Sequence, residues 1–181
     1  MIYNPLRRES MRFLETAAGT RGHRLRVAVS TKEIGAPPLL HYHPEQDETV
    51  VVRAGRLGCV LGDRERFVEA GSTIRFQRRV PHTWWNDGPS ALEVEVTFEP
   101  AGAMQELLES HYGLVREGKV NAQGVPRPLQ AAVVAWHFRR TWVPARIPAP
   151  LRVVAIPVLA AIGRMRGLRA WSPAYAAGPS G

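Results

Sequence analysis

The side chains best suited to chemistry are three histidines and a glutamate in two short stretches of the chain. His41 and His43 lie two residues apart, Glu48 follows shortly after them, and His82 belongs to a later segment. Side chains two apart on a strand share a face, so both imidazoles of the first stretch can point to one side. Imidazole nitrogens and a carboxylate oxygen together suit a first-row divalent ion. The pattern therefore predicts a metal site inside a β-structure.

The number of coordination positions that these four donors leave open depends on the metal. With four protein ligands, six-coordinate Fe²⁺, Mn²⁺, Ni²⁺ or Co²⁺ keeps positions open for water, substrate or dioxygen. Tetrahedral Zn²⁺ is nearly saturated by these ligands. The sequence thus predicts one divalent transition metal ion and leaves its identity open among these metals.

Short strands must position these side chains. Apolar and polar residues alternate loosely on both sides of a glycine-bounded turn at 19–22, and further short segments follow, separated by glycine signals. Many short strands with such turns are typical of an antiparallel sandwich or barrel. Strands are expected within 9–34 (two of them), at 39–43, 48–53, 56–62, 66–69, 73–77, 83–86 and 91–98.

The pattern changes to helical spacing after Pro100. Pro157 should kink or break the last of the helices, and the chain from Ser172 onward is expected to fray. We therefore predict a β-domain at 1–100 and a helical C-terminal extension at 101–181. The helices are expected at 102–115, 128–140 and 150–166.

Charge is distributed unevenly along the 181 residues, which carry a net charge of +8. Residues 1–121 hold 16 basic and 16 acidic side chains, whereas residues 122–181 hold eight arginines and no acid. Any attraction to an anionic partner therefore belongs to the C-terminal segment. A single cysteine, Cys59, excludes an internal disulfide framework. The sequence also shows no apolar signal segment and no apolar run of about 20 residues. Together these features predict a cytoplasmic protein.

The two stretches resemble the two sequence motifs of the cupin superfamily. The first motif is matched without a departure by Gly35, His41, His43, Glu48 and Gly55. The second is matched by Gly71, His82 and Asn86, but Gln77 and Arg79 replace its proline and second glycine. Those two substitutions concern the shape of the turn before the last strand of the motif and not a metal ligand.

The resemblance implies a mainly β fold, a jelly-roll β-barrel, whose metal ligands are His41, His43, Glu48 and His82. One copy of the motif pair indicates a monocupin, a type that often forms a homodimer. Glu48 is also the candidate catalytic residue, because in cupins similar to quercetinases it could shuttle a proton; a role as a ligand alone is the alternative.

An apolar, aromatic-walled cavity beside the metal is expected to hold a small-molecule ligand. Its expected lining is Val50, Val52, Phe76, Trp84 and Asn86. The preferred function is a metal-dependent enzyme, a non-haem dioxygenase-type oxidoreductase similar to quercetinases, acting on a hydrophobic or aromatic molecule. The alternative is a non-catalytic cupin that binds or senses a small molecule while its basic tail docks to a partner or membrane.

The tail resembles the extension of a group of uncharacterised bacterial cupins, which implies no activity. Its first helix could pack on the barrel or on a second copy, leaving the arginines in solvent. Alternatively, the apolar run at 153–162 and its flanking arginines could give residues 122–181 a peripheral membrane contact. No helix-turn-helix signature is visible, so no specific nucleic-acid partner is expected.

Overall fold

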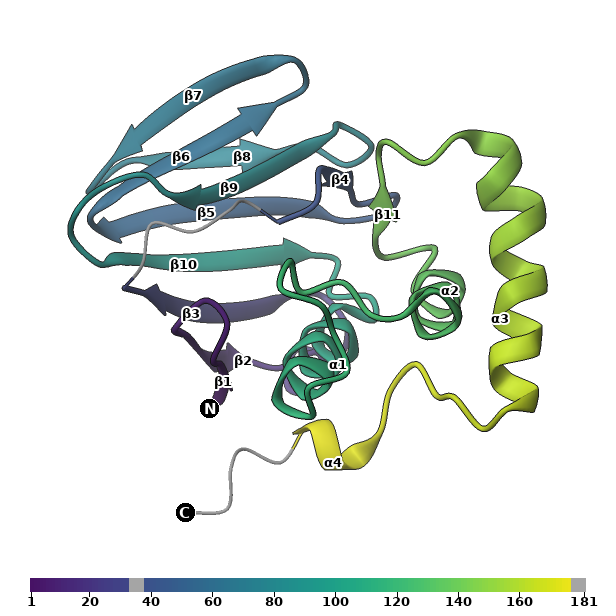
Figure 1. The fold of residues 1–181 in the computed structure, drawn as a ribbon. Helices are drawn as coiled ribbons and strands as arrows, with labels where there is room; N and C mark the ends of the chain where they lie inside the picture. The colour runs from purple at the N-terminus through teal and green to yellow at the C-terminus, as the bar shows by residue number, and fades with distance from the viewer. Residues whose placement is uncertain (33–37, 177–181) are drawn as a thin grey trace.

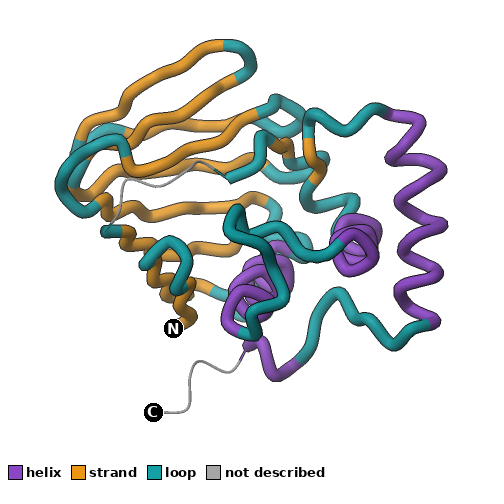
Figure 2. The backbone as a smooth tube through the Cα atoms, viewed as in Figure 1, coloured by secondary structure: helices purple, strands orange, loops and turns teal. Residues whose placement is uncertain are grey.

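The structure is a computed structural model that describes residues 1–32 and 38–176. Within these residues two antiparallel sheets face each other on one side of the molecule, and helices lie on the other side (Figures 1 and 2). The strand order is β1-β2-β3-β10-β5-β8 in one sheet and β11-β4-β9-β6-β7 in the other. The predicted mainly β, jelly-roll architecture with a helical C-terminal part is confirmed.

The strands follow the predicted segments closely, with two additions: β1 near the N-terminus and β11 between α2 and η1. Their bounds are β1 (Ile2–Asn4), β2 (Glu9–Glu15), β3 (Leu25–Thr31), β4 (His41–Tyr42), β5 (Asp47–Ala54), β6 (Arg56–Leu61), β7 (Arg64–Glu69), β8 (Thr73–Phe76), β9 (His82–Asn86), β10 (Leu92–Glu99) and β11 (Val143–Pro144).

Strict alternation of buried side chains builds the core between the sheets. In β3 every second residue is buried, and β10 shows the same period. The register pairs Val94 of β10 with Val29 on one side and with Val52 on the other, so valines of three strands line one face. Leu57 and Cys59 of the facing sheet close this core.

The helical part begins directly after β10. Its elements are α1 (Met104–Arg116), α2 (Pro128–His137), the π-helical segment η1 (Leu151–Ala155), α3 (Ile156–Met165) and α4 (Pro173–Ala176). Helix α1 packs beside β1 and β2, where the Tyr112 hydroxyl donates a hydrogen bond to the Glu9 carboxylate. Helices α2 and α3 form a pair in which Gly163 lies directly against Val133.

Two expectations about the C-terminal part are corrected. Pro157 does not break its helix: the backbone stays helical from η1 into α3, and the hydrogen bonding changes from π-helical to α-helical directly before this residue, which cannot donate an N–H. The chain from Ser172 does not fray at once, because α4 forms and buries Tyr175 against Gly113. Residues 177–181, and Gly35 of the first motif, lie outside the described residues.

Candidate metal centre

Strands from both sheets bring the three histidines and the glutamate together. His41 opens β4, His43 follows that strand, Glu48 lies in β5, and His82 opens β9. Strands β4 and β9 pair through His41 and His82. One ligand atom from each residue lies within 4.8 Å of the others, and each of the four residues is at most 9% exposed. The structure thus brings together every residue that the sequence predicted as a ligand, in a cluster that could hold a metal ion.

Each imidazole is held through its Nδ1 by a backbone carbonyl. The contacts are His41 Nδ1 to Leu39 O (2.7 Å), His43 Nδ1 to Thr141 O (2.7 Å) and His82 Nδ1 to Val80 O (2.8 Å). A carbonyl oxygen only accepts, so Nδ1 of each ring carries the proton and donates it. Nε2 of the neutral ring then presents a lone pair, the arrangement that metal-binding histidines show.

The Glu48 carboxylate faces two of these nitrogen atoms. Its Oε2 lies 3.0 Å from His43 Nε2 and 3.1 Å from His82 Nε2. Burial raises the pKa of Glu48, but hydrogen bonds and charge from both histidines outweigh it and hold the pKa well below its usual range. Two imidazole lone pairs and a carboxylate cannot face one another at these distances unless protons or a cation lie between them.

His41 differs from the other two imidazoles. Burial, helped by the neighbouring His43 and His82, lowers the pKa of His41 to about 3. Burial also lowers the pKa of His82, but the hydrogen bond and charge of Glu48 outweigh it and raise this pKa. At neutral pH, His41 is therefore an uncharged nitrogen donor beside an ionised carboxylate, as a divalent ion requires.

Aromatic side chains of the barrel fix the cluster. The Trp84 indole N–H donates to Glu48 Oε1 at 2.8 Å, so both carboxylate oxygens have a partner. The Phe76 ring stacks on His82, with centroids 4.6 Å apart and planes 12° apart. Phe98 meets His43 edge-on at 5.6 Å. These contacts leave the donor groups little freedom to turn.

The C-terminal extension also contacts the cluster, which the sequence did not indicate. The carbonyl that holds His43 belongs to Thr141, and the Trp142 ring lies over His41 with centroids 5.6 Å apart. Strand β11 pairs with β4, so the extension lies beside the strand that carries the histidines (Figure 1). A backbone carbonyl can belong to any residue type, so no sequence signal could have identified Thr141.

The residues predicted to line a substrate pocket contribute differently. Val50, Val52 and Phe76 are fully buried in the core. The Asn86 side chain makes hydrogen bonds within the turn after β9. Trp84 alone is partly exposed. The substrate pocket therefore stays a prediction.

A separate cavity of about 280 Å³ lies close to His82. It is lined by Leu61, Arg75, Gln77 and Val80. Leu61 is the cross-strand partner of His82, and the Val80 carbonyl holds the ring of His82. The cavity therefore opens at the end of the barrel where His82 lies.

Comparison with known families agrees with this geometry. The family described as "Cupin domain" matches residues 26–104, which contain all four clustered residues. Residues 26–104 therefore form a cupin domain. The predicted family is thus confirmed. A comparison with curated protein sequences finds no significant match.

Solved structures of similar architecture include three with informative names. KdgF from Halomonas sp. is 18% identical over 54% of this chain and 84% of its own, with a TM-score of 0.46. The Cnp3 cupin domain of Schizosaccharomyces pombe is 10% identical over 54% and 68%, with a TM-score of 0.46. A sugar phosphate isomerase from a cupin superfamily of Silicibacter pomeroyi is 25% identical over 49% and 59%, with a TM-score of 0.42. None of these similarities assigns an activity to this chain.

The substitution of arginine for the second glycine of the second cupin motif coincides with an unusual backbone conformation. Arg79, where cupins carry glycine, has φ of 66°, in the left-handed region that glycine adopts without strain. Its N–H donates to the His43 carbonyl at 2.8 Å, which ties this turn to the first motif. The turn thus adopts a conformation that favours glycine although an arginine occupies the position.

Proposed function

We propose that this chain is a metal-dependent cupin enzyme in which His41, His43, Glu48 and His82 hold one divalent transition metal ion. One observation carries the proposal: all three Nδ1 atoms are bound to carbonyls, while Nε2 of His43 and His82 meets the carboxylate. A single divalent cation satisfies these facing acceptors. Two added protons would instead place two imidazolium charges in a buried site.

The reaction we propose first is oxidative and of the dioxygenase type. An iron-like ion held by these four groups would offer open coordination positions to dioxygen or to a chelating oxygen of the substrate. The chain's own residues orient the donors: Trp84 fixes Oε1 of Glu48, and Trp142 shields His41. Both oxygens of Glu48 already have partners, Oε2 with the histidines and Oε1 with Trp84. We therefore assign Glu48 to metal binding rather than to proton transfer.

A small aromatic or apolar molecule is the substrate class that the surroundings of His82 favour. Leu61 and Val80 give the neighbouring cavity apolar walls, while Arg75 and Gln77 offer polar groups at its edge. Trp84 is partly exposed and adds an aromatic surface beside Glu48. These features suit a planar molecule with one or two oxygen atoms that can approach the metal.

The burial of the site favours a second candidate, a non-catalytic cupin that binds or senses a small molecule. His82 is fully buried, and His43 and Glu48 are each 2% exposed. Phe76 and the core valines fill the barrel beside them. A metal enclosed in this way could stabilise a binding protein without turning over a substrate.

Oxygen consumption separates the two candidates. The full chain is loaded with Fe²⁺ without oxygen, its metal content is measured, and oxygen uptake is followed with a panel of flavonols and related enols. The enzyme hypothesis predicts about one ion per chain and substrate-dependent uptake. Full metal loading without uptake on any compound would favour the binding protein or a non-redox reaction. Arg79→Gly, outside the donor set, serves as the control and should behave like the wild type.

A further inference from the structure

The helices of the extension leave an apolar surface uncovered. Of the eleven large hydrophobic side chains that are exposed among the described residues, six lie on η1 and α3, at 37% to 80% exposure. They are Leu151, Val153, Val154, Val158, Leu159 and Met165. Figure 1 shows α3 on the side of the molecule away from both sheets. We call these six residues, together with Arg164 and Arg166, the α3 surface.

Helix α3 packs through one face only. Gly163 is buried against α2, so this side of the helix is covered. At 3.6 residues per turn, Val158 and Met165 fall on the opposite side, and Arg164 and Arg166 lie to either side of them. Both arginines are exposed. The uncovered face is therefore an apolar stripe with a cation on each flank.

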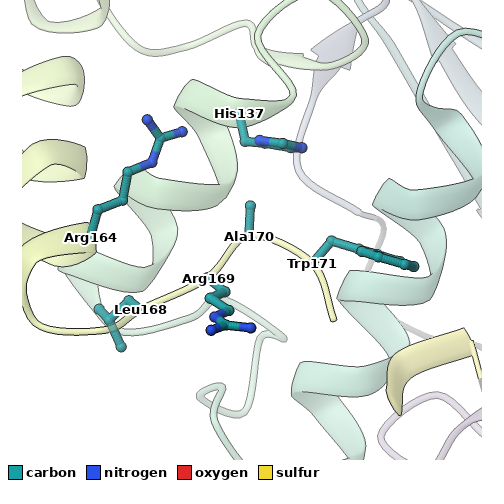
Figure 3. Close-up of a pocket in the computed structure, with 6 residues that line it drawn as sticks. All are labelled: His137, Arg164, Leu168, Arg169, Ala170 and Trp171. Carbon is teal, nitrogen blue, oxygen red and sulfur yellow. The ribbon is translucent and has the colours of Figure 1, made fainter. Parts of the chain in front are cut away.

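A basic pocket adjoins the α3 surface at the C-terminal end of α3. It has a volume of about 280 Å³ and is lined by His137, Arg164, Leu168, Arg169, Ala170 and Trp171. Figure 3 shows Arg164 extending from α3 and His137 from α2, with Arg169 on the segment that follows α3. Its lining includes no carboxylate, and within residues 1–32 and 38–176 neither arginine forms an ion pair.

We propose that the α3 surface docks this chain onto a membrane that contains anionic lipids. The six apolar side chains enter the boundary between headgroups and acyl chains, and the basic pocket receives a lipid phosphate. Charge complementarity selects this occupant, because residues 122–181 hold eight arginines and no acid, and although Arg140 pairs with Glu45 of the barrel, the two arginines of the basic pocket face no carboxylate in its lining.

A second copy of the chain fits this surface less well. In a symmetric dimer through α3, the same patch faces itself, so the arginines of both copies would share one interface. The whole segment 122–181 contains no carboxylate that could pair with them. An anionic lipid surface covers the apolar stripe and neutralises the flanking cations together.

No helix in the described part of the chain is long and apolar enough to cross a membrane. The proposal concerns contact with one surface of the bilayer, with α3 lying in the plane of the interface. It is independent of the reaction proposed above, because it uses no residue of the metal cluster.

Vesicle co-sedimentation with the full chain tests the docking surface. Binding is compared between phosphatidylcholine vesicles and vesicles in which part of the phosphatidylcholine is replaced by phosphatidylserine, at low and high salt. The wild type should bind the anionic vesicles at least about tenfold more tightly than the neutral ones, and salt should weaken this binding. Equal binding to both vesicles, or no binding to either, would overturn the proposal.

Two variants locate the contact. Val158→Glu with Met165→Glu should abolish binding, and Arg164→Gln with Arg169→Gln should weaken binding to anionic vesicles by about fivefold for each arginine. The matched control is Phe67→Glu with Arg64→Gln on β7, where both residues are exposed in the barrel; it should bind like the wild type. Circular dichroism checks that all variants fold.

Analytical ultracentrifugation decides between lipid and a second copy. A monomer without vesicles, or a dimer that persists in Val158→Glu with Met165→Glu, leaves α3 uncovered and supports the membrane surface as the occupant. A dimer that dissociates on Val158→Glu with Met165→Glu would show that a second copy covers α3, and the proposal would fail.

Discussion

The barrel and the C-terminal extension differ in the charged side chains that they carry. In the barrel, acids and arginines pair: Asp47 binds Arg75 at 2.7 Å and Arg78 at 3.1 Å. The charged side chains of residues 122–181 are all arginines. Most of the exposed large hydrophobic side chains of the described residues lie on η1 and α3. Arg140 of the extension pairs with Glu45 of the barrel, but the α3 surface presents apolar and cationic side chains that suit a partner outside the chain.

The two regions nevertheless meet at the candidate metal centre. The barrel supplies the four donor groups, and the extension supplies the Thr141 carbonyl and the Trp142 ring. Through these contacts the extension forms part of the candidate metal site and is not an appendage to a complete barrel. One tryptophan from each region contacts the cluster, which allows a matched comparison.

The largest effect is expected from the tryptophan of the barrel. Trp84→Phe removes the N–H that holds Glu48 Oε1 and leaves a buried charged acceptor without its partner. We expect the metal-free protein to lose about 2 kcal/mol of unfolding free energy and metal affinity to fall at least about tenfold. Chemical denaturation and metal titration measure both quantities.

Trp85→Phe is the control for this change, because the Trp85 N–H reaches Asp87 at 3.3 Å, away from the cluster. Its loss should cost clearly less in stability and nothing in metal affinity. Equal effects of the two variants on stability and metal affinity would show that the contact with Glu48 contributes no more than the contact with Asp87.

The tryptophan of the extension should have a smaller effect. Trp142→Ala opens the side of His41 that the ring covers. Metal affinity should fall by about tenfold, or about 1.4 kcal/mol, as expected for residues that support metal ligands. Trp136→Ala is the control, since this ring packs under Arg139 on α2. Unchanged affinity in Trp142→Ala would mean that the barrel holds its metal without the extension.

A substitution in the turn before β9 should change the unfolding free energy by less and in the opposite direction. Arg79→Gly places glycine at φ of 66°, which relieves backbone strain of about 1 kcal/mol, partly offset by the greater freedom of glycine in the unfolded chain. We expect a gain of up to about 1 kcal/mol in the denaturation free energy and unchanged metal content. Arg66→Gly within β7 should instead destabilise the protein, and a loss of stability in both variants would contradict the strain at Arg79.

The junction between barrel and extension should respond to pH. Burial raises the pKa of Glu9 despite its hydrogen bond from Tyr112. Ionisation of Glu9 therefore destabilises the folded state; this cost is present above the folded pKa and disappears as pH falls to the unfolded value of about 4.5.

Glu9→Gln should thus be more stable than the wild type at pH 7, by about 0.5 kcal/mol because the glutamine still accepts from Tyr112, and equally stable near pH 4. Denaturation curves at the two pH values measure the difference. A gain that persists unchanged at pH 4 would contradict ionisation as its cause.

Alternation and motif spacing predicted most of the barrel from the sequence. In β3 and β10 every second residue is buried, and all of these except Thr31 are apolar, so the pattern in the sequence is the pattern in the core. The ligand cluster was predicted equally well, because His-x-His on one strand and a later histidine specify both residue type and spacing. These features are local or carried by residue types with a distinct chemistry.

What could not be predicted depends on contacts between distant segments. Strand β11 has two residues, too few for a period, and it exists because it pairs with β4 about a hundred residues earlier. The Thr141 carbonyl is a backbone group without a sequence signature. The break expected at Pro157 does not occur, because the backbone accommodates the proline by a π-helical segment directly before it, which no residue pattern in the sequence indicated.

Elemental analysis of protein purified without a chelator tests the central claim most directly. The account predicts about one transition metal ion per chain in the wild type and in His23→Ala, whose histidine is exposed and outside the cluster. His82→Ala should contain almost none, because it removes one of four donors from a buried site. Equal metal content in the wild type and His82→Ala would contradict the account.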